Sequence, residues 1–203
     1  MPEVSPDGLQ LQKNTDARAV YLKPGATFDQ YHRVAILDCF VEFAKDWERD
    51  YNRNVGGIQG RVTKDDMERI KADLAAEFKK VFTKELQDKG NYPVVDIAAP
   101  DVLVLRPAII NLIVTAPDLM TADMSRTLVA SAGQMTLYLE LWDSTTNTLL
   151  ARIMDPQADQ GMGGMAQVAD RVTNKVAADR ILREWAGKLR KHLDAVHAKA
   201  PGP

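Results

Sequence analysis

Three histidines, His32, His192 and His197, carry the side chains in this sequence best suited to acid–base or metal chemistry. His192 and His197 are five residues apart in a segment with helical periodicity. Five residues turn a helix by about 500°, so these two imidazoles do not share one helix face as a zinc-binding pair would. We therefore predict structural or solvent-exposed histidines, with no metal ligands and no catalytic role among them.

The stretch DSTTNT, residues 143 to 148, gathers hydroxyl groups and one carboxylate between two runs of alternating apolar and polar side chains. Asp, Ser, Thr and Asn fold their side chains onto a turning backbone. Ser144 has no G-x-S-x-G motif around it and no histidine nearby in sequence. The stretch predicts the corner of a β-hairpin rather than a reactive site, and we expect no catalytic residue in it.

Two glycine-rich stretches, VGGIQG (55–60) and QGMGGM (160–165), superficially resemble phosphate-binding loops. Neither has the G-x-x-x-x-G-K-[ST] pattern or the G-x-G-x-x-G motif between a strand and a helix. Their composition favours ordinary loops, and the methionines of the second are equally suited to covering a hydrophobic groove. We expect no bound cofactor. The single cysteine, Cys39, lies in the apolar run AILDCFVEF and is predicted to be an inert small hydrophobe, because no basic residue nearby would activate it.

Two charged residues stand inside predicted strands, Asp38 in AILDCFVEF and Arg106 in VLVLRPAII. A buried charge without a partner costs several kcal/mol, so each needs a partner or contact with water. We predict that Asp38 and Arg106 pair with each other across the sheet or at one of its ends. The pair is expected to be structural, with a ligand-binding pair as the alternative.

Apolar periodicity predicts the elements that would position these residues. In chain order we expect a strand covered on both faces (31–43), a helix (64–89), a short extended segment (92–100), a strand (102–116), a strand ending at residue 142, its antiparallel return (149–155) and a closing helix with an apolar stripe from 178 to 196. Pro107 lacks a backbone donor, which predicts an edge position or a bulge at that point of its strand. The order predicts an α+β domain with a mixed or antiparallel sheet of about five strands and two main helices packed on it.

Within this scheme, residues 1–20 are predicted to be a flexible, loosely attached arm, because Pro2, Pro6 and Gly8 stand among polar residues without periodicity. Residues 21–200 are predicted to form a single domain. On the strand that ends at residue 142, leucines occupy one face while Tyr138 and Trp142 occupy the other. We predict that these two aromatic residues form an interaction surface unless a helix covers them.

Composition limits the possible functions. The chain has 203 residues, 45% of them hydrophobic and 27% charged, which is typical of a folded globular protein. A net charge of −2 argues against nucleic acid as a partner. No window approaches the roughly 18 apolar residues of a membrane helix, and one cysteine excludes a disulfide within the chain. The mixed charges of the closing helix favour a solvated face over contact with lipid headgroups.

Four of these segments, in this order, resemble a bacterial family of envelope lipoproteins known as domain-of-unknown-function family 3313. The segments are YLKPGATFDQYHRVAILD, YPVVDIAAPDVLVLRPAI, MTLYLELWDSTTNTLLARIMD and EWAGKLRKHL. The resemblance implies a protein that is secreted with a lipoprotein signal, cleaved before a lipid-modified cysteine and tethered to a bacterial membrane. This sequence lacks such a signal, and Cys39 lies too deep in a predicted strand to be the modified cysteine. We interpret the sequence as the mature domain, with Met1 in place of the signal.

We therefore expect a non-catalytic periplasmic domain that binds an envelope protein or a small ligand. We expect it to be attached to the membrane only through a lipid anchor. The alternatives are a hydrolase-like enzyme with an unrecognised active site, or a cytoplasmic binding module if the N-terminus is native. A concave pocket with converging acidic, histidine or serine groups would favour the enzyme. A flat, weakly polar surface would favour the binding module.

Overall fold

The computed structural model describes residues 1–55, 60–114, 127–129, 133–158, 167–169 and 171–199. Its centre is a mixed seven-stranded sheet in the order β1-β2-β8-β7-β5-β3, with β4 pairing β5 next to β3. The strands of this sheet are β1 Gln10–Leu11, β2 Ala19–Leu22, β3 Arg33–Ile36, β4 Phe40–Phe43, β5 Val102–Val114, β7 Gly133–Asp143 and β8 Leu149–Ala158. The short strands β6 Thr127–Val129 and β9 Gln167–Ala169 pair with each other. The predicted α+β class is confirmed, and the sheet has more strands than the five expected.

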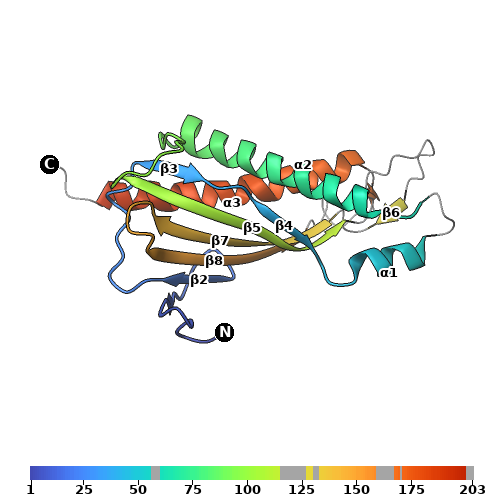
Figure 1. Cartoon of the computed structure of the whole chain (residues 1–203), viewed down its shortest axis with the longest axis horizontal. Helices are drawn as coiled ribbons and strands as arrows, with labels where there is room; N and C mark the ends of the chain where they lie inside the picture. Colours follow the sequence, from blue (N-terminus) through green and yellow to red (C-terminus); the bar gives the residue numbers. More distant parts are fainter. Residues whose placement is uncertain (56–59, 115–126, 130–132, 159–166, 170, 200–203) are drawn as a thin grey trace.

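Helices α2 Lys64–Thr83 and α3 Arg171–Lys199 lie side by side along one side of the sheet (Figure 1), and the short α1 Trp47–Asn54 follows β4. A capping box starts α2, because the Thr63 hydroxyl accepts the Asp66 N–H while the Asp66 carboxylate accepts the Thr63 N–H. The last predicted turns of this helix are a π-helix, η1 Lys84–Lys89. Among the described residues, every helix is too short or too polar to cross a membrane.

The main core lies between the sheet and the two long helices. The predicted apolar stripe of α2 is buried there, and the rings of Phe78 and Phe82 stack against each other with both side chains fully buried. Leu182 of α3 and Leu139 of β7 are buried in the same core cluster. The leucine face of β7 therefore meets the helices, as its alternation predicted.

The segment 31–43 differs from the prediction of one strand covered on both faces. It forms two short strands, β3 and β4, which both pair in parallel with β5 at the edge of the sheet. The Leu105 carbonyl accepts a hydrogen bond from the Leu37 N–H. Backbone groups of alternate strand residues point to the same side, so the position of Pro107, two residues later, also faces β3 and β4. Pro107 has no N–H to offer, and β3 and β4 separate opposite it. The bulge in β5 lies elsewhere, between Ile110 and Ile113.

The N-terminal segment also differs from its prediction as a loosely attached arm. β1 pairs with β2, and β2 pairs with β8, so residues 10 to 22 extend the sheet. Leu9, Ala19 and Tyr21 are buried together in a second, small hydrophobic cluster. Apolar side chains that were too few to give a periodic pattern still bury enough surface here to hold the segment in place.

Candidate functional site

The structure does not bring Asp38 and Arg106 together. Asp38 is fully exposed in the break between β3 and β4, where its carboxylate lies 3.7 Å from the Lys79 ammonium of α2. Arg106 lies on β5 with its guanidinium 3.8 Å from Glu140 on β7. The predicted ion pair does not form, because the prediction treated residues 31–43 as one continuous strand with Asp38 inside the sheet. The chain instead leaves the sheet between β3 and β4, opposite Pro107, and Asp38 is exposed to solvent there.

Glu140 is the centre of a polar network on the sheet face that points away from the helices. The Tyr138 hydroxyl donates to Glu140 Oε1 at 3.1 Å, and the Trp142 indole Nε1–H donates to Oε2 at 3.2 Å. Arg152 of β8 donates from Nη2 to Oε1 at 2.9 Å. With only 7% of its surface exposed, Glu140 is a buried carboxylate whose charge is balanced by arginine and whose oxygens are hydrogen-bonded.

Strand register brings these groups together. Glu140 lies directly opposite Arg152 in the β7–β8 pair and directly opposite Arg106 in the β5–β7 pair. Directly opposite residues share a face of the sheet, so both arginines flank the same carboxylate. Arg152 also bonds the Asp7 carboxylate at 2.6 Å and lies over the Tyr138 ring, 5.7 Å from its centroid. The network thus links three strands and the N-terminal segment.

Two groups of the network, Arg152 and Tyr138, have pKa values raised by their surroundings. Burial disfavours the charged form of Arg152, but its hydrogen bonds to Asp7 and Glu140 outweigh that effect and raise the pKa of the guanidinium. Burial, followed by the negative charge of Glu140, raises the pKa of Tyr138. The network is therefore built to hold side chains in place, because neither group changes its charge near neutral pH.

Phe40 extends this region to the edge of the sheet. It pairs with Ala108, which lies opposite Tyr138, so the phenylalanine shares the outward face and is 59% exposed. Tyr138 and Trp142 are both half-buried, and Arg106 keeps 65% of its side chain exposed. We call Phe40, Arg106, Tyr138 and Trp142 the outer-face patch. The predicted aromatic pair lies in it, while Phe40, Arg106 and the underlying Glu140 were not foreseen as members.

The DSTTNT stretch forms the predicted hairpin corner between β7 and β8. Asp143 accepts hydrogen bonds from the Thr145 and Thr146 N–H groups and, through its other oxygen, from the Tyr31 hydroxyl at 2.7 Å. The Ser144 hydroxyl donates to the Ala99 carbonyl and accepts from the Ala99 N–H. The polar groups of this corner are thus bonded to the turn itself and to neighbouring loops.

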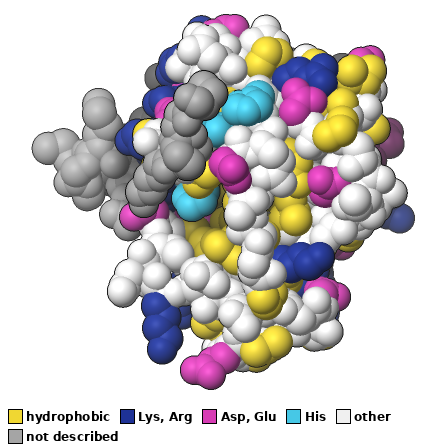
Figure 2. All heavy atoms as spheres, turned by 90° about the vertical axis from the view of Figure 1, so that its left-hand side faces the viewer, with side chains coloured by type: hydrophobic (Ala, Val, Ile, Leu, Met, Phe, Trp, Pro, Cys, Tyr) yellow, Lys and Arg dark blue, Asp and Glu magenta, His cyan; other side chains and the backbone are white. Residues whose placement is uncertain are grey.

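The three histidines, predicted to be structural or solvent-exposed, lie at one end of the molecule. Figure 2 shows histidine side chains on this end, beside apolar side chains. The His32 and His197 rings stack with centroids 4.8 Å apart, and His192 lies edge-on to Phe28. Within the described part of the chain, no three histidine, cysteine, aspartate or glutamate side chains are grouped to hold a metal ion.

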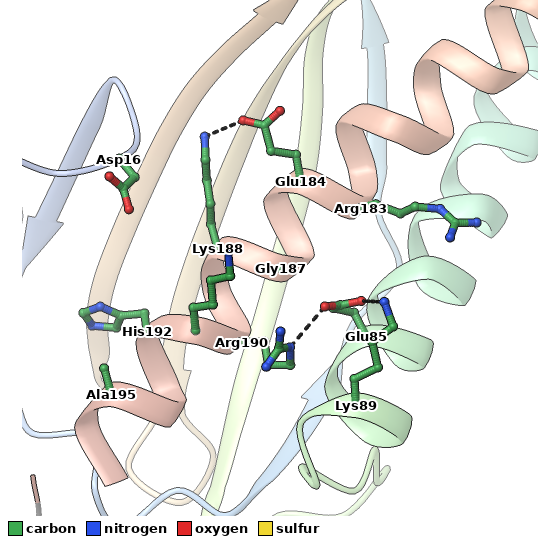
Figure 3. A pocket seen from close by; sticks show the side chains of 11 residues that line it. Asp16, Glu85, Lys89, Arg183, Glu184, Gly187, Lys188, Arg190, His192 and Ala195 are labelled. Atoms are coloured by element: carbon green, nitrogen blue, oxygen red, sulfur yellow. Dashed lines mark hydrogen bonds and ion pairs between the residues drawn. The ribbon is translucent and has the colours of Figure 1, made fainter. Parts of the chain in front are cut away.

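A groove of about 710 Å³ runs along the outside of α3 and η1 (Figure 3). Several of its charged groups bond one another: Glu85 lies between Lys89 and Arg190, and Lys188 bonds Glu184. Burial opposes ionisation of Glu85, but hydrogen bonds from Lys89 and Arg190 outweigh it and lower the pKa of the carboxyl. The groove is therefore a polar, solvent-exposed surface where α3 lies beside η1, in agreement with the solvated face of mixed charge expected for the closing helix.

Cys39 is half-buried at the β3–β4 break. Burial raises the pKa of its thiol to about 12, so the reactive thiolate is scarce at neutral pH. This environment agrees with the predicted inert role.

Comparison with known proteins places the chain in a family. The family model described as "Protein of unknown function (DUF3313)" matches residues 4–189. Among curated proteins, none matches the sequence. Protein XCC0632 from Xanthomonas campestris is 12% identical, with a TM-score of 0.44, over 86% of this chain and 90% of that one. The PelC dodecamer from Paraburkholderia phytofirmans is 10% identical, with a TM-score of 0.42, over 84% and 96% of the two chains. Because the family model covers most of its length, the chain belongs to the DUF3313 family of proteins of unknown function.

Proposed function

We propose that this DUF3313 protein is a non-catalytic binding module of the bacterial cell envelope, which docks a partner protein on the outer-face patch. The observation that carries the proposal is a sheet face, free of the long helices, whose aromatic and arginine side chains are held in place by the buried Glu140. Aromatic residues and arginine are the side chains enriched at the centres of protein interfaces.

Pre-organisation supports this role. The Tyr138 hydroxyl and the Trp142 indole N–H are already bonded to Glu140, so their rings are restrained before any partner arrives. A partner that covers these two rings would therefore lose little side-chain entropy in fixing them, which lowers the entropy cost of association. Phe40 adds an exposed apolar anchor beside them, and Arg106 adds an exposed cation for a partner's carboxylate.

Photo-crosslinking in the native bacterium tests the docking surface. A photoreactive phenylalanine analogue replaces Phe40 in one variant and Glu68, on the exposed side of α2, in a control variant. We expect one discrete crosslinked product from position 40, lost when Arg106→Ser and Trp142→Ser are added, and no such product from position 68. Equal products from both positions, or none from position 40, would reject the outer-face patch as the docking surface.

The envelope location is supported by the resemblance of four segments to lipoproteins of the bacterial envelope. Expression from the native genomic locus in cells fed a labelled fatty acid tests it. We expect the label on the protein and the protein in the membrane fraction, because a lipid-anchored envelope protein carries a covalently attached acyl chain. An unlabelled protein in the cytoplasmic fraction would support the cytoplasmic binding module instead.

A further inference from the structure

A chain of hydrogen bonds joins the last turns of α3 to two loops at the histidine end of the molecule. His197 Nε2 lies 3.1 Å from the Asp29 carbonyl oxygen, and His197 Nδ1 lies 3.0 Å from the Tyr92 hydroxyl. The same hydroxyl lies 3.0 Å from Asp194 Oδ1, one helical turn before the histidine. Tyr92 is buried, with 5% of its surface exposed, so water cannot easily replace these partners.

When His197 is neutral, this chain of hydrogen bonds has one proton fewer than it has bonds, so one bond lacks a donor. The Asp29 carbonyl can only accept, so Nε2 of His197 must carry a hydrogen, and neutral imidazole then has none on Nδ1. The single hydroxyl proton of Tyr92 must go either to that nitrogen or to the Asp194 carboxylate. Burial, reinforced by the charge of Asp194, raises the pKa of Tyr92, so the hydroxyl keeps its proton throughout the neutral range.

A second proton on the imidazole completes every bond. Nδ1–H of His197 then donates to the Tyr92 oxygen, and the Tyr92 hydroxyl donates to Asp194. The other Asp194 oxygen already accepts from Arg190 Nη1 at 2.7 Å. The imidazolium would also lie close to the Asp194 carboxylate, which adds an attraction between opposite charges.

The charges around His197 come from three elements. On α3 they are Asp194 and Arg190, and the positive charge of Arg190 is shared with Glu85. The loop after η1 contributes Tyr92. The loop before β3 contributes the Asp29 carbonyl and His32, whose stacked ring would repel His197 if both were charged. Arg33, and more weakly His32, lower the pKa of Asp101, which therefore offers a neighbouring negative charge for His32.

We propose that His197 is a proton-operated latch: taking up a second proton closes the Asp29–His197–Tyr92–Asp194 chain and fastens the end of α3 to the two loops. The latch is closed when the imidazole carries both protons, and its contribution is lost as the pH rises and the second proton leaves. The proposal does not depend on what the outer-face patch binds.

Amide hydrogen exchange of residues 194–198, corrected for the intrinsic effect of pH on exchange, measures the latch locally. In the unaltered protein we expect protection about tenfold higher near pH 5.5 than near pH 8, the size expected for one charge-assisted hydrogen bond. Tyr92→Phe keeps the ring but removes the acceptor, and His197→Gln removes the titrating group. In both variants the protection is expected to change less than about twofold between the two pH values.

His192→Gln is the matched control, because this histidine lies on the same helix, is exposed and packs its ring on Phe28. It should keep the full pH dependence, and His32→Gln should keep or increase it because it removes the repelling ring. The proposal fails if protection of the unaltered protein does not depend on pH. It also fails if His197→Gln retains the dependence or His32→Gln abolishes it.

Discussion

At the scale of single residues, the carboxylates of Asp143 and Glu140 accept hydrogen bonds that join segments distant in sequence or on neighbouring strands. Burial opposes ionisation of Asp143, but hydrogen bonds from the Tyr31 hydroxyl and from Thr145 and Thr146 outweigh it and hold its pKa well below the usual range. The same bond, after burial, raises the pKa of Tyr31 to about 12. The hairpin corner is thereby joined to the loop before β3 across a wide separation in sequence.

Acid titration tests this bond. Because the pKa of Asp143 is lowered in the folded state, its stabilising effect is present above the unfolded value of about 3.9 and declines as the pH falls below it. We expect the melting temperature of the unaltered protein to exceed that of Asp143→Asn at pH 7, with a gap that shrinks toward pH 3. Asp96→Asn, which alters an exposed carboxylate, serves as the control. A gap that stays constant over this range would contradict the assignment.

At the scale of elements, short strands owe their existence to tertiary contacts rather than to local pattern. β1 has only two residues and β2 four, lengths at which no periodicity can be recognised in a sequence. They form because β8 offers a free edge and because Leu9, with 1% of its surface exposed, closes a small cluster on the outer face. The helix α2 is the opposite case, because its capping box and apolar stripe are both visible in the sequence.

Substitution in the N-terminal segment measures how firmly it is attached. Leu9→Ala leaves a cavity and is expected to lower the free energy of unfolding by about 2–3 kcal/mol. Val4→Ala, at a residue 55% exposed, should change it by less than about 0.5 kcal/mol. Denaturant unfolding followed by circular dichroism gives both values. A Leu9→Ala protein as stable as the Val4→Ala protein would mean that the segment is loosely attached, as its composition suggested.

At the scale of the whole molecule, β5 and β7 form the middle of the sheet. β7 is paired on both sides along most of its length, and β5 is paired with β7 on one side and with β3 and β4 on the other. One face of both strands is covered by the long helices. Opening these strands therefore requires nearly all of the tertiary structure to separate, whereas β1 and β2 can leave the sheet with only a small cluster disrupted.

Native-state hydrogen exchange should reproduce this order. We expect the slowest amides in β5 and β7, where exchange requires global unfolding, and much faster exchange in β1 and β2, where local opening suffices. Mass spectrometry of peptic fragments provides the measurement without substitutions. Equal protection of β1 and β7 would show that the N-terminal strands unfold only with the core.

Part of the candidate site, the aromatic pair and the hairpin corner beside it, was visible in the sequence, but its central contact was not. Strict alternation placed Tyr138 and Trp142 on the face opposite the leucines, and the DSTTNT composition placed the hairpin corner. A regular hairpin that pairs Trp142 with Leu149 would place Ala151, not Arg152, opposite Glu140. The bulge between Leu141 and Trp142 shifts this register by one residue and creates the Glu140–Arg152 contact. Bulges respond to the twist of the whole sheet and leave no local signature here.

The sequence by itself determined the α+β class, the long amphipathic helix, the antiparallel hairpin and the family, because these depend on interactions between residues a few positions apart or on composition along the chain. Only the tertiary structure decided the edge position of β3 and β4, the attachment of the N-terminal segment, the partners of Asp38 and Arg106, and the meeting of His197 with His32 and Tyr92. The physical reason is common to all four. Each depends on side chains or strand edges that are distant in sequence and are brought within bonding distance only when the sheet and helices pack.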